Sequence, residues 1–519
     1  MDGERHVAEW SKRIARAARR AGIAAGVVLL LSGAAVAQDV VTKQYDDGGV
    51  YKGTFKDGKQ DGTGTYTLPN GYSYTGQWKA GEIQGHGTAH FPNGSVYVGT
   101  FRNGKPDGKG RLTTADGTTY DGDWKNGQMT GQGAEHFANG MTYSGQFKDG
   151  QHEGQGKLES PDGYVYDGTW VKGVQQGKAT ITYPNGTTYS GDIVDGKRQG
   201  TGTLTMPDGL TYVGQWKDGQ INGTGKLTQP NGDVYEGTLA DGKRQGQGKV
   251  TYKNGDTYVG QFANDKRDGT GTFTGHDGYK YTGDWKDGRI EGQGTVTYAD
   301  GSTYTGSFKD DKADGTGKIT YKDGSTYEGD WKAGQIDGQG TATYANGITY
   351  TGGFKDGKNS GHGVMTYPDG YKYDGQWANG QRNGQGTATY PDGTVYTGDF
   401  VNGQRDGQGT LTMKDGFKYV GGWKAGQMDG QGKATYPNGD TYEGTFVKGN
   451  RSGQGTMHYA GGQTQSGHWV NGKLDNSAGG AAGDGAAAPS GTTTDGTTSG
   501  TTTGGTSDGG GSNSSITGD

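Results

Sequence analysis

The chain has 519 residues, of which 28% are hydrophobic and 112 are glycine. Much of the apolar content is Tyr, Trp and Phe, which leaves too little aliphatic side chain for several thick globular cores. The formal net charge of −6 excludes the strongly basic balance of a nucleic-acid-binding protein. The absence of cysteine excludes disulfides, thiolate metal ligands and lipid attachment through a thiol.

The N-terminal residues 1–37 predict a secretory signal. Lys12 to Arg20 supply a basic region, the run from Ala21 to Val36 is weakly polar to apolar, and Ala35-Val36-Ala37 forms a small-residue cleavage site before Gln38. The run is shorter than the ~20 residues of a membrane span. We therefore expect an exported protein, periplasmic or extracellular. The alternative is that the uncleaved segment tethers the protein to the membrane.

A 23-residue repeat dominates the rest of the chain. A tyrosine recurs every 23 residues from Tyr51 to Tyr442, which makes eighteen copies. Counting this tyrosine as offset 0, glycine follows at offsets 2, 11 and 20 in every copy, and at offset 13 except at Ala179. Offset 4 is Trp or Phe except at Ile193 and Leu239. Such a period is the signature of a repeat array, in which each unit contacts only its neighbours.

Two turn signals divide each copy into two strands. The first is a dipeptide at offsets 6–7, such as Asp57-Gly58, and the second is a triplet at offsets 18–20, such as Pro92-Asn93-Gly94. Glycine and Asn/Asp accept the positive φ that hairpin turns need. Period-two alternation between the turns predicts strands, so each copy is expected to be an antiparallel hairpin pair.

The loop lengths predict the register. A two-residue loop at offsets 6–7 would pair offset 4 with 9, 2 with 11 and 0 with 13. A three-residue type I turn ending in a glycine bulge at offsets 18–20 would pair 17 with 21 and 15 with the next tyrosine. With these loops, the apolar offsets 0, 4, 9, 15 and 17 all fall on one face. Glycine at offset 11 would then face glycine at offset 2, and large rings could lean over this gap.

Covariation between offsets 4 and 9 supports the predicted pairing of the two. Copies with Trp at offset 4 usually carry Ile or Met at offset 9, as in Trp78 and Ile83, whereas most copies with Phe carry a polar residue. Directly opposed residues are expected to match in this way. Trp170 with Gln175 and Trp377 with Arg382 depart from the pattern.

The motif Tyr-x-Gly-x-[Trp/Phe]-x-x-Gly-x-x-x-Gly-x-Gly, seen at Tyr74-Gly76-Trp78-Gly81-Gly85-Gly87, closely resembles the MORN repeat. The resemblance covers Tyr51 to about Gly472. It implies an all-β, elongated, single-layer antiparallel array of hairpins. In such proteins the repeats serve as scaffolds, dimerisation surfaces or membrane-associated modules. No kinase or methyltransferase domain of the kind sometimes joined to these repeats is recognised here.

The predicted organisation has four parts: a signal peptide at 1–37, a short lead-in at 38–50, the MORN-type array at 51–474, and a disordered tail rich in Ser, Thr, Gly and Ala at 475–519. Eighteen hairpins predict thirty-six strands in a single layer. Nothing else in the chain obviously covers the aromatic face of such a layer, so we expect this face to be exposed.

Two surfaces are candidates for binding. The aromatic rings on one face are first of all expected to be the structural core of a curved ribbon, but they could also receive a protein segment, a glycan or a lipid. The lysine at offset 5 is first of all expected to form a solvated row that discourages sheet stacking, but it could also contact an anionic surface. The candidate aromatic binding face consists of Tyr74, Trp78, Tyr120, Trp124, Tyr166, Trp170, Tyr212, Trp216, Tyr281, Trp285, Tyr327, Trp331, Tyr373, Trp377, Tyr419 and Trp423. The candidate anionic-surface contacts are Lys79, Lys125, Lys217, Lys286, Lys332 and Lys424.

No chemistry-bearing constellation stands out. His86 and His90 lie four residues apart on one strand, too far for a single metal ion. The Asp-Gly pairs lack calcium-loop spacing, and no Ser/His/Asp arrangement repeats. We therefore expect a non-enzymatic scaffold without cofactor, metal or nucleic acid, which binds a protein partner or self-associates. The alternative is an envelope module that binds phospholipid or cell-wall glycan along the aromatic face.

Overall fold

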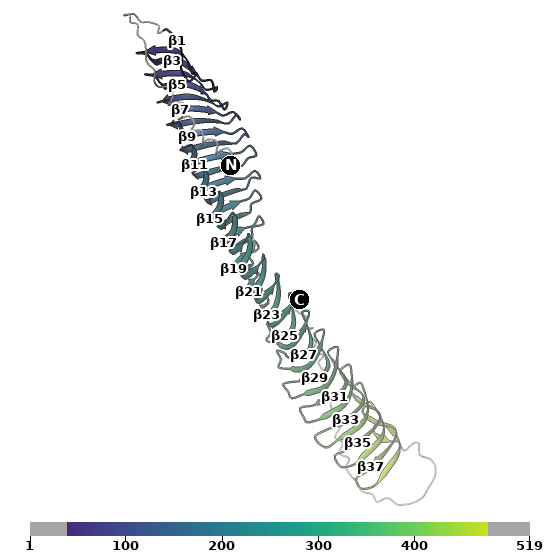
Figure 1. Ribbon diagram of the computed structural model, residues 1–519. Helices are drawn as coiled ribbons and strands as arrows, with labels where there is room; N and C mark the ends of the chain where they lie inside the picture. The colour runs from purple at the N-terminus through teal and green to yellow at the C-terminus, as the bar shows by residue number, and fades with distance from the viewer. Residues whose placement is uncertain (1–38, 476–519) are drawn as a thin grey trace, which may run out of the picture. The chain divides into compact units, whose positions relative to one another are not determined.

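A computed structural model describes residues 39–475 (Figure 1). The predicted signal peptide and all of the predicted tail except Asp475 lie outside the described residues. The described residues form thirty-nine β-strands and no helix, which confirms the all-β prediction. The described residues contain no helix that is long and apolar enough to cross a membrane.

The array divides into two compact units. Unit 1 comprises the described residues up to Gly255 together with Phe262–Asp265, and unit 2 comprises Asp256–Gln261 and the residues from Lys266 onward. Strand β20 (Thr257–Ala263) contributes residues to both.

The strands of unit 1 are β1 (Val41–Gln44), β2 (Val50–Lys56), β3 (Lys59–Thr67), β4 (Ser73–Lys79), β5 (Glu82–His90), β6 (Val96–Arg102), β7 (Lys105–Thr113), β8 (Thr119–Lys125), β9 (Gln128–His136), β10 (Thr142–Lys148), β11 (Gln151–Glu159), β12 (Val165–Val171), β13 (Val174–Thr182), β14 (Thr188–Val194), β15 (Lys197–Thr205), β16 (Thr211–Lys217), β17 (Gln220–Thr228), β18 (Val234–Ala240) and β19 (Lys243–Thr251). The strands of unit 2 are β21 (Lys266–Thr274), β22 (Lys280–Lys286), β23 (Arg289–Thr297), β24 (Thr303–Lys309), β25 (Lys312–Thr320), β26 (Thr326–Lys332), β27 (Gln335–Thr343), β28 (Thr349–Lys355), β29 (Lys358–Thr366), β30 (Lys372–Ala378), β31 (Gln381–Thr389), β32 (Val395–Val401), β33 (Gln404–Thr412), β34 (Lys418–Lys424), β35 (Gln427–Thr435), β36 (Thr441–Val447), β37 (Asn450–His458), β38 (Thr464–Val470) and β39 (Lys473–Leu474).

Within each unit, strands that follow one another along the chain pair antiparallel. The labelled strands in Figure 1 therefore follow one another in chain order within each unit. A seven-residue strand that carries the repeat tyrosine alternates with a nine-residue strand. The thirty-six predicted strands are β2 to β37. The structure adds β1, which lies in the predicted lead-in, and β38 and β39 after the last full copy.

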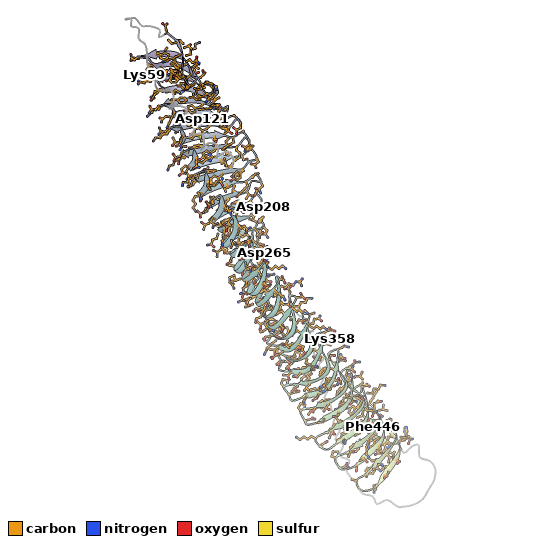
Figure 2. The ribbon with its side chains drawn as sticks, viewed as in Figure 1. Lys59, Asp121, Asp208, Asp265, Lys358 and Phe446 are labelled. Atoms are coloured by element: carbon orange, nitrogen blue, oxygen red, sulfur yellow. The ribbon has the colours of Figure 1, made fainter. Side chains whose placement is uncertain are left out.

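Both predicted turns are confirmed. At offsets 6–7, Ala80 and Gly81 have φ of 52° and 93°, as a two-residue hairpin loop with two left-handed residues requires. At offsets 18–20, the Phe91 N–H donates to the Ser95 carbonyl at 2.8 Å and the Gly94 N–H donates to the Phe91 carbonyl at 2.9 Å. These bonds enclose the three-residue loop with its terminal glycine. Asp208, labelled in Figure 2, lies in a turn of this second kind.

The predicted register within the first hairpin is only partly right. Trp78 faces Ile83, as expected for offsets 4 and 9, and Ala89 faces the next tyrosine, Tyr97. However, Gly76 faces Gly87 rather than Gly85, and Tyr74 faces Ala89 rather than Gly87. A β-bulge adds two residues to the longer strand at this point. Because two residues preserve the side-chain alternation, the apolar offsets still share one face.

The glycine at offset 11 makes the bulge possible. Gly85 has a φ of +81°, a left-handed conformation that a side chain would strain. The amide oxygen of Gln77, at offset 3, accepts the N–H of His86 at 2.8 Å and so pairs a donor that the bulge removes from the ladder. An aspartate does the same elsewhere, as Asp330 does for the Gln339 N–H at 2.7 Å.

The glycines at offsets 2 and 13 lie beneath the tyrosine ring. A Cβ added to Gly87 would lie 2.3 Å from the Tyr74 hydroxyl oxygen, and one added to Gly76 would lie 2.4 Å from it. The prediction that rings lean over bare backbone is therefore confirmed, but with the glycine at offset 13 in place of the one at offset 11. Tyr74 fills the space that two side chains would otherwise need.

Candidate interaction surfaces

The sixteen candidate aromatic residues are buried, as expected for a structural core, so the expectation that this face is exposed is wrong. None of them is more than 9% exposed, and seven of the eight tyrosines are 0% exposed. The rings cover one another: Trp78 contacts Tyr51 of the preceding copy and Tyr74 of its own copy, edge to face, with centroids 5.2 and 5.5 Å apart. This alternation of edge-to-face contacts continues from copy to copy and forms the core.

The polar atoms of these rings are bonded inside the core. The Tyr74 hydroxyl donates to the Gln77 carbonyl at 3.0 Å, and the Trp78 indole N–H donates to the carbonyl of Gly64 in the preceding copy at 3.2 Å. Burial raises the pKa of Tyr373 and of Tyr419 to about 12. The rings therefore serve the fold, and a ligand has no direct access to them.

The six candidate lysines are exposed on the polar face, at the end of the strand beside the two-residue turn. Each of the six lysines lies in a different copy and faces the first residue of the next strand, as Lys332 faces Gln335. The structure does not bring these lysines together into one cluster with a common ligand position.

A second row of rings, at offsets 17 and 21, borders the core beside the three-residue turns. In unit 2, tyrosine occupies offset 17 in five consecutive copies, and each ring is half-buried. These residues, which we call the tyrosine row, are Tyr298, Tyr321, Tyr344, Tyr367 and Tyr390. Tyr371, at offset 21, contacts Tyr367 and Tyr390 with ring centroids 5.3 and 5.1 Å apart. The signal in the sequence was a tyrosine directly before the three-residue turn at offsets 18–20 in consecutive copies.

Arginine at offset 9 packs against the next copy. This contact accounts for its occurrence in copies that carry Phe at offset 4. Arg267 follows Phe262 in the chain, and its guanidinium carbon lies 4.0 Å from the ring centroid of Trp285 in the following copy. The same group donates to the Gly288 carbonyl at 3.0 Å. Arg382 has a Trp in its own copy and lies over the following Phe400 at 5.7 Å. Nothing in the structure explains why Gln175 accompanies Trp170.

Replacing Arg267 by alanine is expected to lower the free energy of unfolding by about 1–2 kcal/mol, because a partly desolvated cation–π contact and a charge-assisted hydrogen bond are both lost. Arg267→Ile should cost less, since Ile290 fills the same offset in the next copy. Chemical denaturation would measure both. Arg102→Ala is the control, because this arginine side chain is 68% exposed. Equal losses for Arg267→Ala and Arg102→Ala would contradict the role given to the guanidinium.

One copy holds a buried polar pair. His152 Nε2 and Glu135 Oε2 are 3.1 Å apart, and both residues are less than 10% exposed. The His152 ring also stacks on Tyr143 with centroids 3.6 Å apart. Glu135 stands at offset 15, which is Ala89 in an ordinary copy. This substitution was the overlooked signal that His152 is not a surface histidine.

The face opposite the rings is mainly polar. Threonine hydroxyls bond across strands, as between Thr295 and Thr305 at 3.0 Å, and Lys318 pairs with Glu328 at 3.2 Å. Open grooves of about 530 Å³ in unit 1 and 670 Å³ in unit 2 run over the glycine backbone between these side chains. Among residues 39–475, no group of three His, Asp or Glu is placed to hold a metal ion.

Solved structures show only weak likeness. The Sas-4 TCP domain of Drosophila melanogaster, in complex with a proline-rich motif of Ana2, is 17% identical over 34% of this chain and 90% of its own, with a TM-score of 0.21. The TCP10 domain of Danio rerio CPAP with a STIL peptide is 15% identical, over 57% and 90%, at a TM-score of 0.10. A streptogramin B lyase is 10% identical, over 57% and 92%, at 0.11. No curated protein matches the chain.

The MORN-repeat family model matches eighteen consecutive segments. They are residues 51–71, 74–96, 97–119, 120–142, 143–163, 166–188, 189–211, 212–234, 235–257, 258–278, 281–303, 304–326, 327–349, 350–370, 373–395, 396–417, 419–441 and 442–464. These segments follow the copies identified from the sequence and together account for most of the chain. The chain is a member of the MORN-repeat family.

Proposed function

We propose that this protein is an exported, non-enzymatic repeat scaffold that binds a protein partner or associates with itself. The observation that carries the proposal is the tyrosine row: the core rings are consumed by packing, whereas this second row stays half-buried along five copies of unit 2. A periodic array of one residue type can hold an extended partner at several equivalent points, which raises its overall affinity.

The chemistry of the tyrosine row suits a protein segment. Each tyrosine offers a flat apolar ring and a hydroxyl, the combination that is enriched in the centres of protein interfaces. Tyr371 and Tyr390 already pack against each other, so the surface is ordered before a partner arrives. We therefore place the contact at the rings of offset 17 rather than at the buried rings that the sequence suggested.

Binding of phospholipid or cell-wall glycan along the aromatic face is the weaker proposal, because the rings at offsets 0 and 4 are buried. A lipid contact would rest on the exposed lysines and would weaken with added salt. We expect no pelleting with anionic liposomes at physiological ionic strength. Salt-sensitive pelleting that Lys286→Ala and Lys332→Ala reduce would favour the alternative.

The predicted signal segment at 1–37 supports the proposed compartment. Cleavage after Ala37 would place the array in the periplasm or outside the cell, and retention of the N-terminal segment would tether it to the membrane. Intact-mass measurement of the protein from the envelope and secreted fractions would separate these two locations.

The test is capture of a partner from the native envelope by cross-linking, compared between the wild type and Tyr321→Ala/Tyr344→Ala. We expect the double variant to lose the partner while it keeps its β-sheet circular dichroism. Thr341→Ala/Thr387→Ala, on the opposite face, is the matched control and should retain the partner. If the tyrosine variant captures the same partner in the same amount, the tyrosine row is not the contact surface.

A further inference from the structure

The described array begins and ends on incomplete repeats. β1 pairs with β2 as the second strand of a copy pairs with the next copy, with Val41 facing Gly53 and Lys43 facing Tyr51. In this register Val41 stands at offset 13 and Lys43 at offset 15. At the other end, β38 is the first strand of a copy, in which Gln465 stands at offset 0.

The two incomplete repeats are complementary in length. Residues 465–475 supply offsets 0–10, and residues 39–50 supply offsets 11–22. Within the described residues, β39 pairs only with Trp469 and Val470 of β38, and no strand pairs with the outer side of β1. The missing half of each end is thus present at the opposite end of the chain.

The two ends also depart from the repeat consensus in matching ways. In internal copies a Cβ on the offset-13 glycine would meet the tyrosine ring, for example at 2.1 Å from the Tyr442 hydroxyl for Gly455. A valine at offset 13 therefore cannot lie beneath the ring of a tyrosine at offset 0. Val41 occupies offset 13 at one end, and glutamine replaces the tyrosine at offset 0 at the other. Val41 is thus compatible with the end that carries Gln465 and incompatible with a repeat that carries tyrosine at offset 0.

Apolar surface is exposed where such a junction would cover it. Phe55 is half-buried, whereas every other residue at offset 4 is buried. Elsewhere this ring packs on the offset-0 side chain of the preceding copy, as Phe101 does on Tyr74 with centroids 5.0 Å apart. Val41 is 46% exposed. Phe55 and Val41 both face the position that an additional repeat would occupy.

We propose that molecules of this protein join head to tail, with β1 of one molecule completing the last repeat of another. In the register of the internal copies, Gly467 would face Val41, Ser466 would face Thr42, and Gln465 would face Lys43. The added strand gives main-chain hydrogen bonds to both open edges. Because the two contacting surfaces differ, the contact is heterologous. Such contacts build an open chain of molecules, unless the rotation between neighbouring molecules closes a ring. The inference specifies the self-association in the proposed function and relies on removal of residues 1–37.

The open edge of β38 could be paired either by β1 of another protein molecule or by the residues that follow Asp475 in the same chain. Their sequence, Asn476-Ser-Ala-Gly-Gly-Ala-Ala482, is poor in residues that favour strands, whereas Val40, Val41 and Thr42 are β-branched. β1 is also already a strand on β2, so its addition orders little new backbone. These two differences favour pairing with β1 of another protein molecule.

The experiment is sedimentation over a concentration series, with the chain expressed in full and isolated in its exported form. Intact mass should show an N-terminus at Gln38; a retained N-terminal segment would contradict the proposal, because it would continue beyond β1. The weight-average mass should rise with concentration to that of a dimer and beyond. A constant monomer mass would overturn the inference, while partner capture by the tyrosine row would be unaffected.

Two variants test the register. Gln465→Tyr restores the ring of an internal copy above Gly467, and the chain should still fold. The ring should exclude Val41 of another molecule, so the mass should stay at that of the monomer. Adding Val41→Gly recreates the tyrosine and both glycines, and association should return. Gln463→Tyr is the control and should associate like the wild type, since Tyr72 occupies the same offset. Association of Gln465→Tyr at wild-type strength would refute the proposed junction.

Discussion

Replacing Tyr327 by alanine is expected to lower the free energy of unfolding by about 3–5 kcal/mol, the range for removal of a buried aromatic side chain. Tyr327 is 0% exposed, and its ring contacts Trp331 and Phe354 with centroids 5.6 and 5.0 Å apart. The substitution would leave a cavity over Gly329 and Gly340 and would remove the contact between adjacent copies. Chemical denaturation, with amide exchange to locate the damage, is the measurement.

Because a repeat array is stabilised by nearest-neighbour contacts, the loss should be concentrated in β24 to β29. Tyr327→Phe separates packing from hydrogen bonding: it removes the hydroxyl's donation to the Asp330 carbonyl at 2.9 Å and the longer one to the Gln339 carbonyl at 3.4 Å, and should cost about 1 kcal/mol. Tyr344→Ala, in the half-buried tyrosine row of the same copy, should cost clearly less than Tyr327→Ala. Equal losses at the two tyrosines would show that the rings at offset 0 are not the core.

Gly340→Val should destabilise unit 2 by about 1–3 kcal/mol or more, through overpacking. A Cβ at this position would lie 2.5 Å from a ring carbon and from the hydroxyl oxygen of Tyr327, and the buried side chain has nowhere to move. Thermal unfolding followed by circular dichroism would show the loss as a lower or broadened transition.

The control for this substitution is Gly461→Val. A Cβ on Gly461 meets no atom within 4 Å, and the backbone there is not left-handed. Its substitution should leave the unfolding transition within error of the wild type. The natural Ala179 at offset 13 shows that one methyl group can be accommodated in that copy, so valine is the more decisive replacement. An unchanged transition for Gly340→Val would contradict the placement of Tyr327 over the glycines.

Sequence reasoning predicted the strands, both turns and the common apolar face, because each depends on local chemistry. The turn dipeptides need positive φ, as Asp57 and Gly58 show, and the alternation of apolar offsets determines the face. The bulge was missed because glycine at offset 11 was assigned to a regular strand. A glycine invariant among the copies and flanked by polar residues, such as Gly85, was the available sign of a left-handed residue.

The burial of the rings could not be obtained from one copy taken alone. A flat single layer would leave Trp78 open to solvent, and the sequence carries no separate layer to cover it. In the structure the covering groups are Tyr51 and Tyr74, so the neighbouring copies form the core among themselves. The half-buried tyrosine row was visible in the sequence only as part of the apolar set, because position along the strand rather than residue type determines its exposure.

The most direct test of the buried aromatic core is an alkaline titration of the tyrosines, followed by tyrosinate absorbance together with β-sheet circular dichroism. An exposed tyrosine ionises near pH 10, whereas burial raises the pKa of Tyr189 and Tyr373 to about 12. A raised pKa in the folded state gives a contribution to stability that is complete below pH ~10 and is lost as the pH rises through the folded-state value. We predict that the rings at offset 0 ionise only above pH 10, together with loss of the sheet signal. Ionisation of all tyrosines near pH 10 with the sheet intact would contradict the account.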